Sequence, residues 1–111
     1  MNLDNKKFIA TANDSGLSSN ETLFRYSQEE DVITGRYSGG GILEGNVVGK
    51  KITDTGIELL FQCLTVDGEL KCGESVGQIS EDDEGRLRLY FDWKWLNGDG
   101  SGGTSAYIEV D

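Results

Sequence analysis

The sequence predicts an all-β protein: a single domain over residues 1–111, folded as an eight-stranded antiparallel up-and-down barrel with meander topology. The segment 85–95 alternates large apolar residues with mostly polar ones over a full strand length. Turn signals rich in Gly, Asn and Asp divide the rest of the chain into seven further short segments. The chain also has 16 Gly and no Pro, which suits a sheet whose strands are paired on both sides.

The eight strands can be placed from this pattern. In the clearest one, 85–95, one face carries Leu87, Leu89, Phe91, Trp93 and Trp95. Helical spacing would scatter these large residues around a cylinder, so the segment reads as a strand. The most hydrophobic segment, 57–66, is expected to be buried on both faces. The other strands are predicted at 6–12, 22–28, 31–38, 42–50, 69–80 and 104–110, with the first turn at 13–16.

Closure into a barrel follows from the edges of the sheet. An open meander of eight strands would leave two edges with unpaired backbone groups, and closing the sheet removes them. A barrel of eight strands has a bore that side chains just fill, or that holds one small ligand. The predicted fold therefore leaves two functions open, a filled structural barrel and a binding protein.

The two cysteines lie on either side of a predicted hairpin turn. If Asp67-Gly68 forms a two-residue turn, Cys63 faces Cys72 across the two strands. Opposed residues can lie close enough for a disulfide, so a redox-sensitive bridge is one interpretation. Two reduced, partly buried thiols are the alternative, and a cytoplasmic setting favours them.

Composition excludes several function classes. The formal charge is −10, which opposes binding to nucleic acid and to anionic membrane surfaces. The chain has no His and only 2 Cys, so we expect no metal site, no cofactor and no His-based catalytic residues. Because residues 1–7 lack the layout of a signal peptide and no long apolar stretch follows, we expect a cytoplasmic protein.

Two glycine-rich segments resemble nucleotide-binding motifs but lack their required context. The run 38–50 has neither the spacing nor the Ser or Thr of a phosphate-binding loop. The glycines at 98, 100 and 103 fit G-x-G-x-x-G, but only eight residues follow, too few for the helix of a dinucleotide fold. Turns and barrel bends explain these glycines better.

Several short motifs, taken in order, resemble a family of short, uncharacterised bacterial proteins with an avidin-like barrel. The resemblance spans most of the chain and is carried by residues 21–26, by 37–40 with Ile42, Gly45 and Gly49, by 67–70, by 85–89, and by 93–95 with Gly98, Asp99 and Gly103. It implies an eight-stranded barrel of the avidin and streptavidin type. No biotin-binding motif can be placed residue by residue. The hairpin at 67–68 looks shorter than in the family, and Cys63 stands where an aromatic residue is usual.

The leading hypothesis is a non-catalytic barrel that binds a small apolar or aromatic molecule in its bore. Aromatic residues would line or close that pocket, the tyrosines orienting polar groups of the ligand: Tyr26, Tyr37, Phe61, Trp93 and Trp95. The alternative is a filled barrel that binds a protein partner through its acidic surface or pairs with itself, as a monomer or homodimer. Members of the resembling family often carry the label N-acetylglutamate synthase, but no motif here supports an acetyltransferase, and no catalytic residue is predicted.

Overall fold

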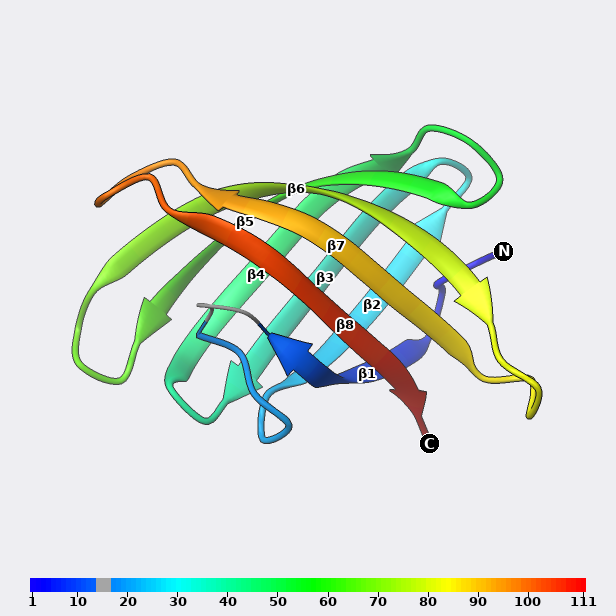
Figure 1. Ribbon diagram of the computed structural model, residues 1–111, viewed down its shortest axis with the longest axis horizontal. Helices are drawn as coiled ribbons and strands as arrows, with labels where there is room; N and C mark the ends of the chain where they lie inside the picture. Colours follow the sequence, from blue (N-terminus) through cyan, green and yellow to red (C-terminus); the bar gives the residue numbers. More distant parts are fainter. Residues whose placement is uncertain (14–16) are drawn as a thin grey trace.

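Eight antiparallel strands form a closed barrel in which each strand pairs with the next and β8 returns to β1 (Figure 1). The computed structural model describes residues 1–13 and 17–111. The strands are β1 (Lys6–Asn13), β2 (Leu23–Glu29), β3 (Val32–Gly39), β4 (Ile42–Lys51), β5 (Gly56–Thr65), β6 (Leu70–Glu81), β7 (Leu87–Trp95) and β8 (Gly102–Val110). The predicted fold is confirmed, and every strand boundary lies within two residues of its predicted position.

The alternation that predicted the strands also sorts side chains between the core and the surface. Along β7 every second residue from Leu87 to Trp95 is buried, and the four between them are exposed. The buried residues of the other strands extend the same core around the inside of the barrel. The predicted turn at 13–16 falls mainly on residues 14–16, outside the described residues. In the part of the chain that is described, no helix is long or apolar enough to cross a membrane.

The β5–β6 hairpin corrects the prediction for the two cysteines. The Thr65 amide donates to the Glu69 carbonyl at 2.9 Å, and Gly68 has a φ of +86°, so three residues rather than two form the loop. This shifts the pairing by one residue: Cys63 lies opposite Lys71, and Cys72 lies opposite Gln62. Because a one-residue shift places the partners on opposite faces of the sheet, the two thiols do not meet, and both are free.

The expectation that segment 57–66 is buried on both faces is also wrong. Ile57, Leu59 and Cys63 are buried inside the barrel, but Leu60, which points outward, is 58% exposed. The reason is that a closed single-layer barrel has only one interior. No second layer covers β5, so its outward apolar residues face solvent however hydrophobic the segment is.

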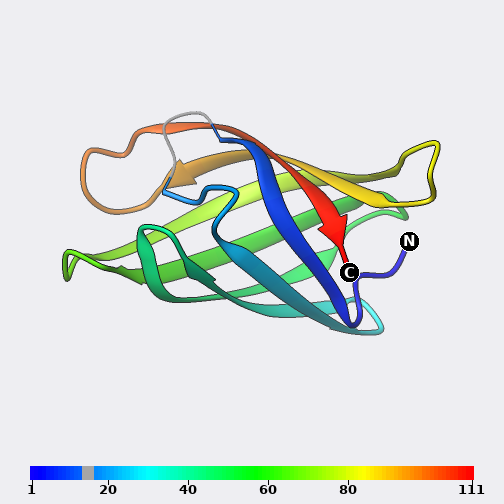
Figure 2. The same cartoon turned by 90° about the horizontal axis from the view of Figure 1, so that it is seen from below.

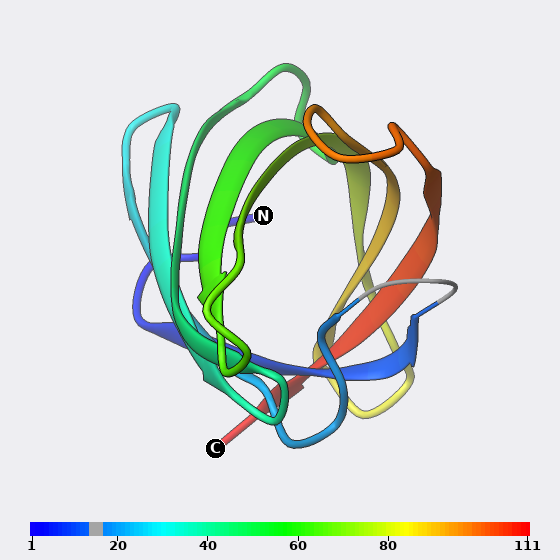
Figure 3. The same ribbon diagram turned by 90° about the vertical axis from the view of Figure 1, so that its left-hand side faces the viewer.

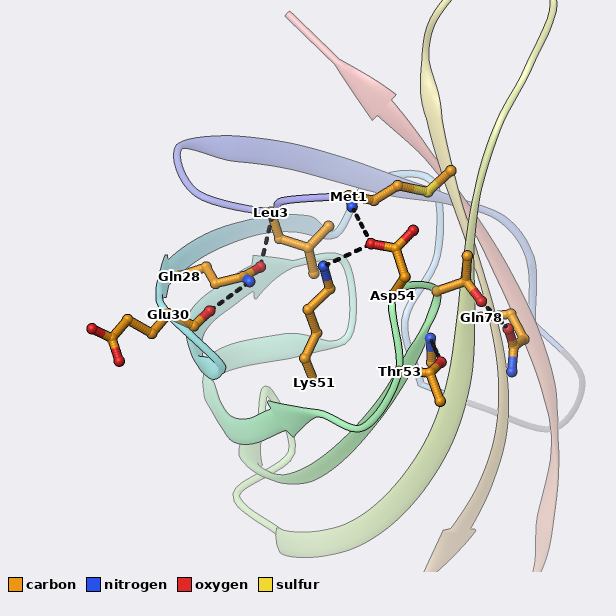
Figure 4. A network of polar contacts seen from close by, with 10 residues as sticks. Met1, Leu3, Gln28, Glu30, Lys51, Thr53, Asp54 and Gln78 are labelled. Atoms are coloured by element: carbon orange, nitrogen blue, oxygen red, sulfur yellow. Dashed lines mark hydrogen bonds and ion pairs between the residues drawn. The ribbon is translucent and has the colours of Figure 1, made fainter.

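The two ends of the barrel differ. At the end where β1, β3, β5 and β7 finish, which we call the mouth, aromatic and small polar side chains gather around a cavity. At the other end, which we call the closed end, the N-terminal segment folds across the opening (Figure 2) and buries Leu3 completely. The Leu3 amide donates to the Gln28 side-chain carbonyl at 2.9 Å, and Gln28 donates in turn to the Glu30 carbonyl at 2.8 Å (Figure 4).

Candidate ligand-binding cavity

A cavity of about 60 Å³ lies inside the barrel near its mouth, the end that faces the viewer in Figure 3. Its wall is mostly apolar, and all five aromatic residues singled out from the sequence line it: Tyr26, Tyr37, Phe61, Trp93 and Trp95. A buried water needs about 10–15 Å³ of such space, so the cavity has room for several waters or for the ligand atoms that replace them.

Aromatic rings from non-adjacent and adjacent strands form the wall. Trp95 packs edge-to-face against Phe61 at a centroid distance of 5.6 Å and against Trp93 at 5.3 Å. On the other side of the barrel, Phe24 stacks on Tyr37 at 4.6 Å. Edge-to-face and stacked pairs are the favourable geometries for aromatic rings, so the wall is held in a defined shape.

Glycines on neighbouring strands make room for two of these rings. A Cβ atom at Gly73 of β6 would lie 2.4 Å from the Phe61 ring, and one at Gly45 of β4 would lie 2.4 Å from the Tyr37 ring. Real Cβ atoms do not approach other atoms this closely, so each ring lies flat across a backbone that only Gly allows. The glycines read from the sequence as barrel bends therefore also set where the cavity rings lie.

Hydrogen bonds tie the segment after β1 to the rim of the cavity. Asn13 donates through its side-chain nitrogen to the Ser18 hydroxyl at 2.6 Å and to the Ser18 carbonyl at 2.9 Å. The Ser18 hydroxyl also lies 3.1 Å from the Tyr107 hydroxyl, which links this segment to β8. Completely buried Thr22 donates to the Gly39 carbonyl at 3.0 Å and so fastens the segment to the β3–β4 turn.

Two polar atoms in the cavity wall are buried and lack a partner among the described residues. These are the indole nitrogen of Trp93, a donor, and the side-chain oxygen of Asn13, an acceptor. The side chain of Trp93 is only 8% exposed, so bulk water does not reach it freely. Leaving a buried polar group unpaired costs about 1–3 kcal/mol, and such groups call for a partner such as an ordered water or a ligand. Two residues that line the cavity thus each carry one unpaired group among the described residues, a donor on Trp93 and an acceptor on Asn13.

Among residues 1–13 and 17–111, no charged side chain lines the cavity; Asn, Ser, Tyr, Cys and Trp supply the polar atoms of its wall. Burial raises the pKa of Tyr26 and of Tyr37 well above the usual value of 10, so both hydroxyls are protonated at neutral pH. The Tyr37 hydroxyl donates to the Gln62 carbonyl at 3.1 Å. Burial also raises the pKa of the Cys63 thiol, against the weaker opposing effects of Tyr37 and Lys71, which keeps the thiol protonated.

Eleven further residues line the cavity that sequence reasoning did not assign to the site. They are Asn13, Leu17, Ser18, Phe24, Ile42, Leu59, Cys63, Ser75, Phe91, Ser105 and Tyr107. Phe91 belongs to the same alternating face as Trp93 and Trp95, so the pattern contained a signal for it. Ser75 and Ser105 are small buried polar residues in β6 and β8, and nothing in the local sequence distinguishes them from surface serines.

Comparison with known proteins places this barrel among relatives. The solved structure of apo shwanavidin is similar, with a TM-score of 0.65 and 10% identity, and the match covers 96% of this chain and 95% of that chain. The structure of the biotin binding protein from chicken is also similar, with a TM-score of 0.66 and 15% identity. That match covers 98% of this chain and 96% of the chicken chain. At these identities the likeness concerns the fold. No curated protein matches the sequence. The family model described as "Avidin-like protein" matches residues 1–110, and the chain therefore belongs to the avidin-like family.

Proposed function

We propose that this barrel binds, without catalysing a reaction, a small molecule whose uncharged, apolar or planar part enters the cavity at the mouth. The observation that carries the proposal is the pair of buried, unpartnered polar atoms, Trp93 Nε1 and Asn13 Oδ1, in an otherwise apolar wall. Binding sites typically combine an apolar lining with a few polar groups that fix the ligand's orientation. A ligand with an acceptor for the indole and a donor for the amide would relieve both unpaired groups.

The chemistry of the wall supports binding rather than catalysis. General acid–base catalysis works best with a group whose pKa lies near the operating pH. The residues that the structure describes place no carboxylate or amine in the cavity wall, and burial raises the pKa of Tyr26, Tyr37 and Cys63 further from neutrality. A bound molecule would therefore be held by apolar contact and hydrogen bonds and released unchanged.

Cyclic amides and ureas are the ligand class that we favour, because their edge presents a carbonyl acceptor beside an N–H donor. Such groups are uncharged, which suits a wall whose described residues carry no ionised side chain. Among the similar structures, the chicken protein is described as biotin binding, and biotin carries a cyclic urea of this kind. Biotin is therefore the first molecule to test, within a panel of cyclic amides, ureas and planar aromatic compounds.

The test is calorimetric titration of that panel, supported by tryptophan fluorescence, with two variants that each remove one indole. Trp93→Phe removes the unpartnered N–H, and we expect it to weaken binding about tenfold, the effect of one lost hydrogen bond. The control Trp95→Phe shrinks another ring of the same wall, and we expect a smaller loss. Failure of the whole panel to bind, or equal losses in the two variants, would contradict the proposal.

A second candidate, docking of a protein partner, is favoured by a groove of about 670 Å³ on the outer face of β5–β8. Leu60 and Val76 in this groove are 58% and 50% exposed, and the carboxylates of Glu58, Glu74 and Asp92 surround them. Three carboxylates against the single ammonium of Lys94 favour a partner segment that is basic and apolar, rather than a second copy of a chain with a charge of −10. The test is calorimetric titration with basic amphipathic peptides. If the protein is a monomer and binds none of these peptides, docking of a protein partner is excluded.

We further propose that the protein works in the cytoplasm. The thiols of Cys63 and Cys72 are free, on different faces of the sheet, and this is the state that a reducing compartment maintains. Fractionation of cells that produce a tagged full-length chain tests the location.

A further inference from the structure

We propose that the outer face of β1–β3 docks an amphipathic helix of a partner protein that is acidic along one side. The three strands are neighbours in the barrel (Figure 1). With one residue of β8, their outward side chains form two parallel rows, one of cations and one of apolar residues. This surface lies outside the barrel, so the inference is independent of the cavity and of its ligand.

The first row, which we call the basic row, consists of Lys7, Arg25 and Arg36. Lys7 lies directly opposite Arg25, and Arg25 lies directly opposite Arg36. Each of the three adjoins a buried, inward-facing ring in its own strand, so all three side chains point outward. The register of the strands thus brings three positive charges into one line across the sheet.

The barrel itself leaves most of this charge unneutralised. Like charges on directly opposed residues are destabilising, yet the chain, with 20 Asp and Glu, places three of its 10 Lys and Arg in this row. Among residues 1–13 and 17–111, no carboxylate lies within ion-pair distance of Lys7 or Arg25. Arg36 pairs with Glu44, but both side chains are well exposed, and exposed pairs are weak. A partner with carboxylates would supply the missing opposite charges.

The surroundings of the basic row are almost free of negative charge. Among the outward side chains that the structure describes on β1–β3, Glu29 is the single carboxylate. It lies at the closed end, four residues from Arg25 along β2, which is about 13 Å. This part of the surface is therefore positive, although the whole chain carries a charge of −10.

A second row, which we call the apolar row, runs beside the basic row. Ile9 of β1 lies directly opposite Leu23 of β2 on one side and Ile108 of β8 on the other. All three are half-buried, and each adjoins a buried inward residue, so they share the outer face. On β1 and β2 the two rows are two residues apart, about 7 Å. A partner that meets the cations therefore also meets apolar side chains.

The spacing of the basic row favours a helix as the partner. Adjacent strands are about 4.8 Å apart, so the cations are presented at intervals of that size. Along one stripe of an α-helix, residues three or four positions apart recur every 4.5–6 Å, approximately. Alternate residues of an extended peptide recur at about 6.6 Å, which matches less well. A closed barrel also offers no sheet edge to which a peptide strand can add.

Charge favours a single helix over larger occupants. A surface of anionic lipid, or a second copy of this chain, would meet the whole molecule with its charge of −10. A helix is narrow enough to meet the positive patch alone. Its carboxylates would lie over the basic row, and its apolar stripe would cover the apolar row.

A synthetic helix of about five turns serves as the probe. It carries Glu three or four positions apart along one stripe and Leu along the neighbouring stripe, with Ala and Gln elsewhere. The control peptide has the same composition in an order that forms no stripe. In calorimetric titration we expect the striped peptide to bind at least about tenfold more tightly than the control.

Variants of the barrel test which residues the helix meets. Arg25→Glu reverses the central charge and should weaken binding of the striped peptide at least about tenfold, whereas Arg25→Lys should keep the affinity within about threefold. Lys50→Glu makes the same change of net charge at an exposed position of β4 near the closed end, and this control should bind within about twofold of wild type. Ile9→Thr keeps a β-branched residue but removes apolar contact and should weaken binding about threefold.

Thermal unfolding separates docking from a structural role. Arg25→Gln relieves the opposition of like charges, so its Tm should equal or exceed that of wild type. A clear fall in Tm would show that the basic row stabilises the barrel by itself and would contradict the proposal.

Three further results would overturn the assignment of the helix. The first is equal binding of the two peptides, and the second is wild-type affinity in Arg25→Glu. The third is that Arg25→Glu abolishes binding to phosphatidylglycerol vesicles, or self-association in sedimentation, because the occupant would then be a membrane or a second copy. The cavity and its ligand are tested separately, since Arg25→Glu should leave ligand binding unchanged.

Discussion

The mouth and the closed end of this barrel are built from the same eight strands but differ in how their side chains pack. At the closed end, aliphatic side chains and one ring pack inside the bore: Leu3, Phe8, Ile33, Ile57, Ile79 and Leu89 are each at most 2% exposed. At the mouth, rings and small hydroxyl-bearing residues surround a cavity, and two buried polar atoms of its wall lack partners.

The difference shows how one barrel separates stability from binding. Aliphatic side chains of matched size interdigitate without voids, whereas large rigid rings beside Ser and Gly leave space between them. Polar groups at the closed end also find partners: the Gln28 side chain accepts the Leu3 amide and donates to the Glu30 carbonyl, which joins the N-terminal segment to the β2–β3 turn. Substitutions at the closed end should therefore change stability, and those at the mouth should change binding.

The largest expected effect is at the closed end. Leu89→Ala should lower the free energy of unfolding by about 3 kcal/mol, because it removes buried methyl groups and leaves a cavity in a dense core. Ser75→Ala, a buried residue of the cavity wall at the mouth, should change it by less than about 1 kcal/mol. Urea unfolding of both variants measures this contrast. Equal destabilisation by the two changes would show that the ends do not differ as described.

A glycine at the mouth tests how tightly the cavity rings are placed. A Cβ at Gly73 would lie 2.4 Å from the Phe61 ring and 2.7 Å from the Lys94 carbonyl. Gly73→Ala should therefore cost about 1–3 kcal/mol of stability and displace Phe61, which weakens ligand binding. Gly41→Ala, where the nearest atom is 3.8 Å away, is the control and should be close to neutral. Unchanged binding in Gly73→Ala would indicate that Phe61 does not shape the site.

One part of the response to acid should come from Glu109 at the closed end. The Glu109 carboxylate accepts the Leu87 amide at 2.9 Å and pairs with Lys6 at 3.1 Å, and these contacts, the first above all, lower its pKa below 4.5. A lowered pKa contributes stability above the usual carboxyl pKa and loses it as the pH falls through the folded-state value. Glu109→Gln should lower the free energy of unfolding by about 0.5–1 kcal/mol at pH 7. It should not change this free energy at a pH where the wild-type carboxyl is protonated.

Urea unfolding of wild type and Glu109→Gln at pH 7 and pH 3 measures this effect, with the exposed Glu74→Gln as a control that should behave like wild type. A gap between wild type and Glu109→Gln that persists unchanged at pH 3 would contradict the assignment. The described part of the cavity wall, without residues 14–16, has no ionised group, so ligand binding should change little between pH 5 and pH 8.

The smallest effect concerns the thiols. Cys63 is 4% exposed with a raised pKa, whereas Cys72 is half-buried on the outer face. A thiol-reactive reagent should modify Cys72 at least about tenfold faster than Cys63 in the folded protein, because the thiolate is the reactive form and access is needed. Comparison of Cys63→Ser and Cys72→Ser assigns the two rates, and a ligand in the cavity should slow Cys63 alone. Equal rates would place Cys63 closer to solvent than described.

Much of the fold could be predicted from local patterns. Alternation along β7 gave both the strand and its inward face, since residues of period two share one side of a sheet. The five predicted aromatic residues all lie at the cavity wall for the same reason. Ser75, Ser105 and Asn13 could not be found this way, because their place at the site depends on which strands face one another across the bore.

The hairpin at Asp67-Gly68 shows the limit of local reasoning. The sequence signals a turn, but the length of its loop, two residues or three, depends on the hydrogen bonds between Thr65 and Glu69. A difference of one residue in the loop changes which residues of β5 and β6 lie opposite each other, and so whether the two cysteines share a face of the sheet. The hydrophobicity of β5 likewise suggested burial on both faces, while the single wall of a closed barrel leaves Leu60 outside.

The amino-acid sequence alone determined the strands, their order and the inward side of β7, because these depend on side chains two residues apart and on turns between neighbours. Tertiary structure decided that the bore is filled at one end and hollow at the other, and that Lys71 stands over Trp95 beside the hollow. These features depend on how rings, glycines and small residues from distant strands meet inside the closed barrel, and such contacts leave no pattern along the chain.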